Sequence, residues 1–354
     1  MAHGGGILHY NGTYFWYGED KSGRTYIPEA DLDTYSPPRV DLIGVRCYSS
    51  VDLYNWKDEG LVLRAGDHPD LHASRVLERP KVLHNERDGS FVMWMHIDDA
   101  HYDEAKAGVA RARSPTGPFE YLGSSRPNRQ MSRDMTVFKD DDGKAYLFYS
   151  SEENQVMHVA QLAPNYLSVV TNYDRVLVGL SREAPAVFKH QGLYLLLTSG
   201  CTGWLPNAAE VFAAPSPKGP WQSLGNPCQD ADVIACNTTF GAQDTYVFPV
   251  LGRDGRGNFI LMADRWNPQD LGSSRYVWLP LRVKVYGDLR RISWEQHGLE
   301  WRRRRPHSSG GSIDRQLASR RGGGVSVTFR WFDEWDLGVF DRPDLWAQNL
   351  LMPS

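Results

Sequence analysis

The 354-residue sequence lacks several features that would assign it directly to a class of protein. It has no run of 18 consecutive apolar residues, so it offers no membrane-spanning helix. Its four cysteines include no C-x-x-C pair, which argues against a zinc ribbon or a thioredoxin-like site. It has no G-x-S-x-G elbow and no glycine loop that opens a helix, so neither an acyl-transfer serine nor a phosphate site is indicated. No metal and no cofactor are expected.

The amino terminus also lacks the signals of export. The chain opens Met1-Ala2-His3-Gly4, without the basic segment and apolar core of a signal peptide. We expect that the sequence starts late or that the protein is not exported by a cleaved signal. Sequons at Asn11 and Asn237 would permit glycosylation of a secreted chain. The cysteines allow three pairings, and the sequence does not choose among them.

Charge is low overall but uneven along the chain. The net charge is −4, yet residues 282–324 hold eleven Lys and Arg against four Asp and Glu, together with seven Gly. A nucleic-acid patch is one interpretation of Arg302–Arg305. The absence of strand-like alternation and of a neighbouring basic stripe favours a solvated insert instead. We therefore expect neither a nucleic-acid nor a membrane partner, and a monomer.

What the sequence does contain is a repeated hairpin unit. A polar turn with a glycine precedes an aromatic-rich or aliphatic run five times, and each glycine can supply the positive φ of a tight turn. The units are 11–17 (NGTYFWY), 88–94 (DGSFVMW), 142–148 (DGKAYLF), 191–197 (QGLYLLL) and 256–262 (RGNFILM). A second repeat, SPTGPF at 114–119 and SPKGPW at 216–221, is two such units apart. We predict an all-β, five-bladed β-propeller that forms one domain over residues 1–354, with a β-sandwich as the alternative.

Three carboxylates lie at equivalent points of successive units. Glu78, Asp134 and Glu183 each come just before or at the start of the first strand of a predicted blade. A lone acid beside an arginine is usually a structural ion pair, but three in the same register would converge on the axial cavity. Convergent carboxylates can hydrolyse a glycosidic bond, and aromatic rings, here 12 Trp and 17 Tyr, can stack on sugars.

Several segments together resemble the exo-β-1,3-galactanase branch of glycoside hydrolase family 43. The resemblance covers residues 2–281 and 326–340. Its motifs are 2–7 (AHGGGI), 78–81 (ERPK), 92–96 (VMWMH), 132–135 (SRDM), 182–186 (REAPA), 199–207 (SGCTGWLPN), 276–280 (YVWLP) and 333–337 (DEWDL).

The resemblance implies an inverting hydrolase of β-1,3-galactan that releases galactose from a chain end. Glu183 would be the general acid, and Asp134 would orient it and modulate its pKa. The wider family has an aspartate base where this chain has Gly4, so Gln243 would hold the attacking water. Glu78 would lie near the same sugar and stays open as the base.

The resemblance also implies sugar contacts and a location. Sugar-contacting positions are matched by Tyr102, Asn154, Thr202 and Trp204. An extracellular or secretory location is expected of the family. An α-L-arabinofuranosidase or β-xylosidase remains an alternative, as does a catalytically impaired carbohydrate-binding propeller. The block 282–324 departs from the branch and interrupts the last blade, where the ring must close.

Overall fold

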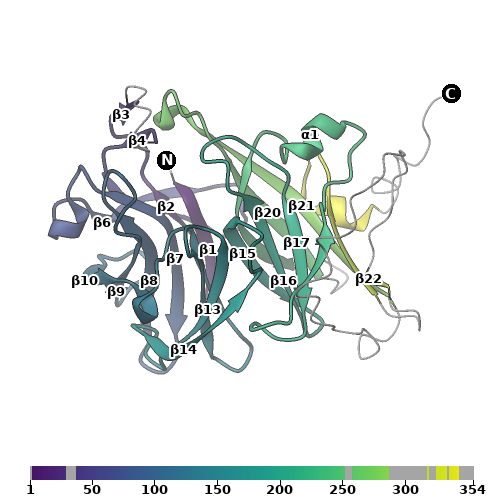
Figure 1. Ribbon diagram of the computed structural model, residues 1–354, viewed down its shortest axis with the longest axis horizontal. Helices are drawn as coiled ribbons and strands as arrows, with labels where there is room; N and C mark the ends of the chain where they lie inside the picture. The colour runs from purple at the N-terminus through teal and green to yellow at the C-terminus, as the bar shows by residue number, and fades with distance from the viewer. Residues whose placement is uncertain are drawn as a thin grey trace.

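The structure, a computed structural model, describes residues 2–28, 37–251, 257–286, 317–318, 324–332 and 335–342. The described chain forms five antiparallel sheets around a common axis, plus one two-stranded hairpin (Figure 1). The first strand of each sheet contacts the first strands of the sheets on either side, in the order β1, β7, β11, β15, β19 and back to β1. The predicted all-β, five-bladed propeller is therefore confirmed. None of the described helices is long and apolar enough to span a membrane.

Each blade is built from one continuous stretch of chain. Blade one holds β1 (His3–Tyr10), β2 (Thr13–Glu19), β5 (Gly44–Ser50) and β6 (Lys57–Arg64). Blade two holds β7 (Val76–Asn85), β8 (Ser90–Asp98), β9 (Lys106–Ala112) and β10 (Glu120–Ser125). Blade three holds β11 (Met135–Lys139), β12 (Ala145–Ser151), β13 (Val156–Leu162) and β14 (Val169–Val176).

The remaining elements complete the ring. Blade four holds β15 (Arg182–His190), β16 (Leu193–Gly200), β17 (Glu210–Ala214) and β18 (Gln222–Gly225). Blade five holds β19 (Gln243–Leu251), β20 (Gly257–Arg265), β21 (Arg275–Tyr286), β23 (Gly324–Phe329) and β22 (Leu317–Ala318). The small hairpin is β3 (Thr25–Tyr26) with β4 (Arg39–Val40), and the described α-helix is α1 (Val233–Asn237). The described residues also include 3₁₀ turns at Pro69–Leu71, Pro127–Arg129, Leu271–Ser273 and Leu337–Asp341.

The repeated glycine turns join the first two strands of the blades. Gly12, Gly89, Gly143 and Gly192 have φ between 69° and 81°, the left-handed region that the turns require. The fifth expectation is wrong in detail, because Gly257 is already the first residue of β20 and pairs with Leu251. The turn that precedes it lies outside the described residues. The second repeat joins the third and fourth strands of blades two and four.

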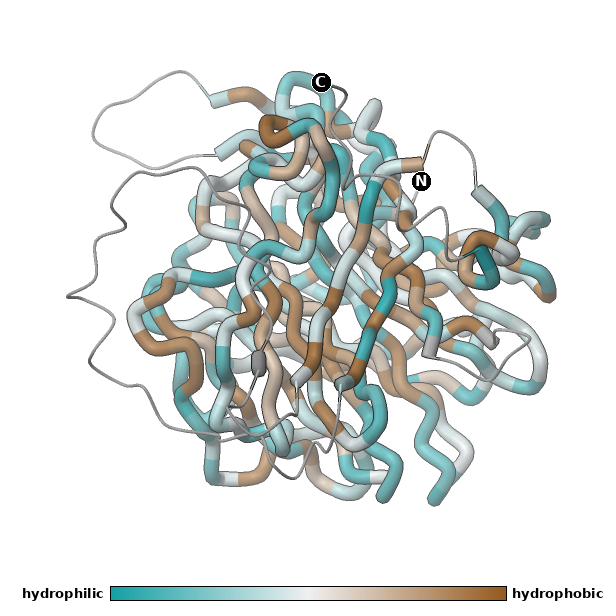
Figure 2. The backbone as a smooth tube through the Cα atoms, turned by 90° about the vertical axis from the view of Figure 1, so that its right-hand side faces the viewer, coloured by the Kyte–Doolittle hydropathy of each residue, from teal (hydrophilic) through white to brown (hydrophobic). Residues whose placement is uncertain are grey.

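Apolar side chains fill the space between neighbouring blades. Clusters of buried residues combine side chains from two sheets, such as Phe188 of blade four with Phe259 of blade five. Along the tube in Figure 2, hydrophobic segments run through the strands and hydrophilic ones gather at the connecting loops. Because the strands of one blade need the next blade to cover them, the ring must close to bury its first and last sheets.

Blade one closes the ring on blade five without exchanging a strand. The buried His3 ring lies 2.8 Å from Asp264 Oδ1, and the Gly4 amide donates to Asp264 Oδ2 at 2.9 Å. Ile7 of β1 packs with Phe248 of β19 and with Val339 of the last 3₁₀ turn. Blades one and five are therefore held together by hydrogen bonds at the start of β1 and by apolar packing further along it.

The basic block 282–324 lies largely outside the described residues. Its two ends are part of blade five, since β21 continues to Tyr286 and β23 begins at Gly324. Those two residues pair with each other across the sheet. Within the block, β22 also pairs with β23, so every described part of the block belongs to the blade-five sheet.

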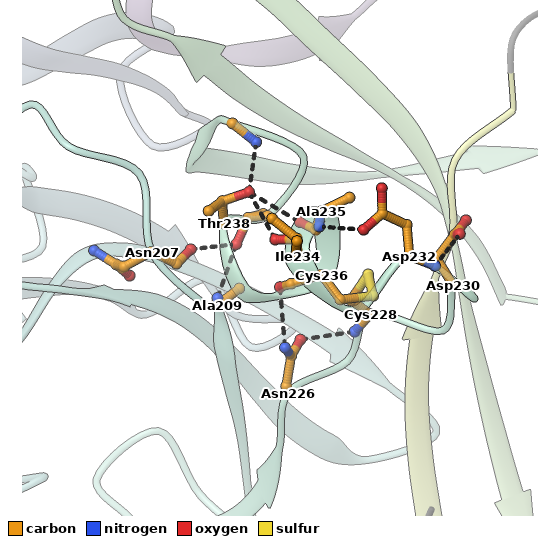
Figure 3. Close-up of a disulfide and its surroundings, with 12 residues drawn as sticks. Asn207, Ala209, Asn226, Cys228, Asp230, Asp232, Ile234, Ala235, Cys236 and Thr238 are labelled. Atoms are coloured by element: carbon orange, nitrogen blue, oxygen red, sulfur yellow. Dashed lines mark hydrogen bonds between the residues drawn. A yellow bond between two sulfur atoms is a disulfide. The ribbon is translucent and has the colours of Figure 1, made fainter.

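A disulfide closes the connection from blade four to blade five (Figure 3). It joins Cys228 to Cys236. Asn226 accepts a hydrogen bond from the Cys228 amide at 2.9 Å and donates to the Cys236 carbonyl at 3.1 Å. Asp232 caps α1 through the Ala235 amide. This braced loop leads directly into β19. The pairing leaves two cysteines as free thiols, Cys47 and Cys201.

Candidate active site

One end of the five first strands opens into a cavity of about 640 Å³. Its lining includes all four predicted catalytic residues, which come from four blades: Glu78, Asp134, Glu183 and Gln243. Three of the four predicted sugar-contacting residues line it too: Tyr102, Asn154 and Trp204. The convergence expected from the repeat register is therefore present in the structure.

Four of the five first strands, all except β11, have a register shift where they reach the cavity. Register shifts fall between His3 and Gly6, Glu78 and Lys81, Glu183 and Ala186, and Asp244 and Tyr246. A bulge redirects side chains, and such bulges are common beside active sites. Arg79 and Ala184 take positive φ values of 57° and 51° there. Non-glycine residues hold that conformation only where the surroundings enforce it.

Glu183 is the carboxyl group best suited to donate a proton. Burial raises its pKa to about 8, and the nearby Asp134 carboxylate adds to the rise. Asp134 does not contact the Glu183 carboxyl in a hydrogen bond; it accepts from the next amide, that of Ala184, at 3.0 Å. This contact fixes the backbone that carries Glu183. A carboxyl group held protonated near neutral pH can act as a general acid.

Arg79 ties the site together, and the sequence analysis did not select it. Its guanidinium contacts both oxygens of Asp134, at 2.8 and 3.1 Å. It also donates to Gln243 Oε1 at 2.6 Å and to the Asp244 carbonyl at 3.2 Å. The side chain is buried, and its charge offsets that of Asp134. The signal available in the sequence was its place in the ERPK motif, between Glu78 and a proline.

Gln243 is held by four hydrogen bonds. Its Oε1 accepts from Arg79 and, at 2.9 Å, from the Trp266 indole. Its Nε2 donates to Glu183 Oε1 at 3.0 Å and to Ser199 Oγ at 2.9 Å. Both Oε1 partners are donors only, so the amide has one orientation that satisfies them.

Glu78 is an ionised carboxylate on the blade-two side of the cavity. Tyr102 donates to it at 2.8 Å, and the buried His96 ring approaches at 3.4 Å. Burial alone would raise the pKa of Glu78, but His96 and the Lys21 ammonium outweigh it and hold that pKa at about 2. Burial likewise opposes protonation of His96, yet Asp98 and Glu78 raise its pKa to about 9. Glu78 is thus a weak base and a good acceptor for a sugar hydroxyl.

A second buried ion pair contributes Glu19 to the cavity lining, and the sequence analysis missed it. Glu19 ends β2, and its Oε2 lies 2.8 Å from Lys21 Nζ. Burial raises the pKa of Glu19 to about 8, while Lys21 opposes the rise. Its Oε1 lies 2.5 Å from the position that an ideal Cβ on Gly4 would take. Gly4, with φ of 62°, therefore has no room for a side chain. The sequence signal was a charged residue that ends an aromatic strand.

Aromatic rings form one wall of the cavity. Trp204 and Trp266 meet edge to face with centroids 5.0 Å apart. The Lys21 ammonium lies over both rings, at 5.2 and 5.5 Å. The Trp204 indole donates to the Pro38 carbonyl at 3.0 Å, which joins a blade-four loop to a blade-one loop. That contact closes this side of the opening.

Two of the residues predicted to contact sugar, Asn154 and Thr202, lie differently relative to the cavity. Asn154 lines the cavity, and its buried Oδ1 has no hydrogen-bond partner among the described residues. Thr202 is not among the residues that line the cavity, so its predicted sugar contact stays a prediction. Its hydroxyl donates to the Leu205 carbonyl and accepts from the Asn207 amide. These two hydrogen bonds stabilise the loop that carries Trp204.

Three potential metal ligands also meet here. Glu78, His96 and Asp134 offer atoms within 4.8 Å of one another. Arg79 already contacts Asp134, and Lys21 lies 3.8 Å from Glu78. These cations supply the positive charge that a metal ion would bring, so the trio is satisfied by protein groups.

The propeller and its carboxylate-lined, aromatic-walled cavity define a class of protein, the carbohydrate-cleaving enzymes. The sequence profile described as "Glycosyl hydrolases family 43" matches residues 7–231, more than half of the chain. The chain therefore belongs to glycosyl hydrolase family 43, whose members hydrolyse O-glycosyl bonds. A curated relative, a beta-D-galactofuranosidase of Aspergillus niger, is 24% identical over 255 residues, 66% of this chain and 73% of that protein.

Solved structures of the same family are similar over most of the chain. A family 43 beta-1,3-galactosidase is 33% identical, with a TM-score of 0.75 over 96% of this chain and 61% of its own length. Another, solved with galactodeoxynojirimycin, is 34% identical, with a TM-score of 0.74 over 95% of both chains. An exo-beta-1,3-galactanase from Phanerochaete chrysosporium is 37% identical, with a TM-score of 0.69 over 79% of this chain and 60% of its own. The chain thus spans about three fifths of the first and third of these proteins.

Proposed function

We propose that this protein is an exo-acting β-1,3-galactanase that releases galactose with inversion at the anomeric carbon. The observation that carries the proposal is Glu183, a carboxyl group with a raised pKa that lines a cavity with an aromatic wall. The similarity to β-1,3-galactosidases and to an exo-β-1,3-galactanase supports the choice of substrate.

Glu183 protonates the glycosidic oxygen as the bond to the terminal sugar breaks. Its raised pKa keeps the proton available at neutral pH, and donation costs little because Arg79 and Gln243 stand beside the carboxylate that forms. Asp134 acts through the backbone amide next to Glu183 and through its own charge. It is a positioning residue that also sets the pKa of the acid.

The shape of the cavity supports attack at a chain end. The Trp204 indole and the Pro38 carbonyl join across one side, so the polysaccharide has no open path through that wall. Trp204 and Trp266 offer ring faces to the terminal sugar, while Glu78, Tyr102 and Asn154 offer polar atoms to its hydroxyls. A cavity of about 640 Å³ accommodates one or two sugar units.

The test is hydrolysis of a linear β-1,3-galactan followed by proton NMR in the first minutes. We expect galactose as the only early product, appearing first as the α-anomer. Early oligosaccharides would contradict the exo mode, and an initial β-anomer would contradict inversion. Binding of the polymer without product would favour the carbohydrate-binding alternative. Activity confined to an aryl α-L-arabinofuranoside or an aryl β-xyloside would favour those substrates.

A further inference from the structure

Two residues with left-handed backbone at the cavity hold the same carboxylate. Arg79 of β7 and Ala184 of β15 have φ values of 57° and 51° although neither is glycine. The Arg79 guanidinium contacts both oxygens of Asp134, at 2.8 and 3.1 Å, and the Ala184 amide donates to Asp134 Oδ2 at 3.0 Å. Such conformations persist only where the surrounding structure enforces them. The backbone therefore departs from its usual preference at the two points that fix Asp134.

The hydrogen bonds around Glu183 form a closed ring. From Asp134 the ring passes to Arg79, whose Nη2 also donates to Gln243 Oε1 at 2.6 Å. Gln243 Nε2 then donates to Glu183 Oε1 at 3.0 Å. Glu183 is followed in the chain by Ala184, whose amide returns to Asp134. Glu183 is thus held at its backbone and at its carboxyl, and both paths lead to Arg79.

The ring keeps the positive charge one group away from the acid. A guanidinium in direct contact with Glu183 would favour the ionised carboxylate. Among the described residues, no hydrogen bond joins Arg79 to Glu183, and the neutral Gln243 amide connects them instead. Arg79 can therefore hold the Glu183 carboxyl in place without an ion pair that would remove its proton.

Trp266 leaves the ring a single arrangement. Its indole N–H donates to the same Gln243 Oε1 at 2.9 Å. Arg79 and the indole are donors only, so the amide must turn its oxygen to them and its Nε2 to Glu183 and Ser199. Both side chains of the link, Arg79 and Gln243, are buried. The position of the Glu183 carboxyl is therefore set by groups that have no alternative partner in the ring.

We propose that Arg79 is a positioning residue for the general acid, which it aligns with the glycosidic oxygen through Asp134 and through Gln243. The inference rests on the proposed function. It makes Arg79 important for the one step in which Glu183 gives up its proton, whereas a structural ion pair would matter for the fold alone.

The test is a comparison of two leaving groups with Arg79→Lys, which keeps the charge but not the fork that reaches Asp134 and Gln243 together. With β-1,3-galactobiose, whose leaving sugar needs a proton, kcat should fall roughly fiftyfold while KM changes by less than about threefold. With a dinitrophenyl β-galactoside, whose leaving group departs without a proton, kcat should stay within about fivefold of wild type. A purely structural role would lower both rates together.

The pH profile gives a second readout. The Arg79 charge lowers the pKa of Glu183, so Arg79→Met should raise that pKa and move the alkaline limb of kcat/KM to higher pH. Arg79→Lys should leave the limb near that of wild type. If Arg79→Met does not fold because Asp134 loses its partner, the double variant with Asp134→Asn removes both charges. It should show the same dependence on the leaving group.

Arg111→Met is the matched control. Arg111 pairs with Asp88 at 3.0 Å at the hairpin end of blade two and does not line the cavity, so both rates should be unchanged.

Equal losses of kcat on the two substrates for a folded Arg79→Lys would overturn the inference, as would an unchanged kcat on β-1,3-galactobiose. In both cases an active wild type leaves the proposed function standing. A wild-type protein that releases no galactose from β-1,3-galactobiose would overturn the proposed function itself, and this inference with it.

Discussion

The two ends of the first strands in each blade follow different rules. At the hairpin end, pairing is regular and described glycines such as Gly12 and Gly192 take the positive φ that a turn needs. At the cavity end, the register breaks, Arg79 and Ala184 adopt left-handed conformations, and charged side chains are buried. Backbone conformation thus follows ordinary residue preferences at the hairpin end and violates them at the cavity end, where the candidate active site lies.

The two ends also differ in how their charged side chains are paired. A buried carboxylate needs partners, and at the cavity end Arg79, Lys21 and His96 supply them. At the hairpin end, acids such as Asp142 pair with lysine in solvent, where a pair contributes little. Substitutions should therefore affect activity and stability very differently at the two ends.

The largest contrast should come from the two ends of β15. Glu183→Gln removes the proton donor but keeps its shape, so kcat on β-1,3-galactan should fall roughly 10²- to 10⁴-fold. His190→Gln, at the hairpin end, should leave kcat unchanged. Steady-state kinetics with matched thermal melts would check both. Activity within tenfold of wild type for Glu183→Gln would show that another group donates the proton.

The next effect concerns the junction between blades one and five. Asp264→Ala leaves the buried His3 ring and the Gly4 amide without their acceptor, so the free energy of unfolding should fall by about 3 kcal/mol. Asp142→Ala, in an exposed turn, should give no measurable change. Equilibrium denaturation with urea would compare them. Equal midpoints for both variants would mean that this polar pair does not hold the ring closed.

The pH profile should report the charge of Asp134. Glu183 must be protonated to act, so activity should fall as pH rises through its pKa, which burial and Asp134 raise. Asp134→Asn removes a negative charge and frees Arg79, and both changes lower the pKa of Glu183. The alkaline limb of kcat/KM should move to lower pH by roughly one unit. An unchanged alkaline limb would show that the charge of Asp134 does not affect the pKa of Glu183.

The smallest effect should be seen at the turns. Gly192→Ala meets no neighbour within 4 Å but keeps a φ of 81°, so it should cost about 1 kcal/mol of stability and no activity. Gly4→Ala would in addition bring a Cβ to 2.5 Å from Glu19, so it should lower both stability and kcat. Thermal melts and steady-state kinetics of the two variants would test this. Equal losses of stability and of kcat in both variants would contradict the contrast between the two ends.

Much of the architecture could be predicted because it depends on short-range patterns. The hairpin glycines and the strands that follow them repeat along the chain, and they located the blades with one error at Gly257. The register of Glu78, Asp134 and Glu183 within those repeats predicted that they would meet. Periodicity and turn chemistry act over a few residues, so they are visible in sequence.

The site was predicted less completely, for a physical reason. Thr202 lies in the right loop, but its hydroxyl bonds within that loop and does not line the cavity. Glu19 was missed because it ends the second strand of its blade, whereas the predicted carboxylates lie at first strands. Arg79 was missed because an arginine next to Glu78 in the sequence is usually read as a structural ion-pair partner. Their importance comes from contacts with residues of other blades.

The sequence by itself determined the number of blades, the position of their turns and the carboxylates that converge on the axis, because these follow from local pattern repeated along the chain. Only the tertiary structure decided which cation neutralises which carboxylate, how Gln243 is oriented, and which side chain fills the space beside Gly4. Those outcomes depend on burial and on groups far apart in the chain, such as Arg79 and Gln243, which become neighbours only when the ring closes.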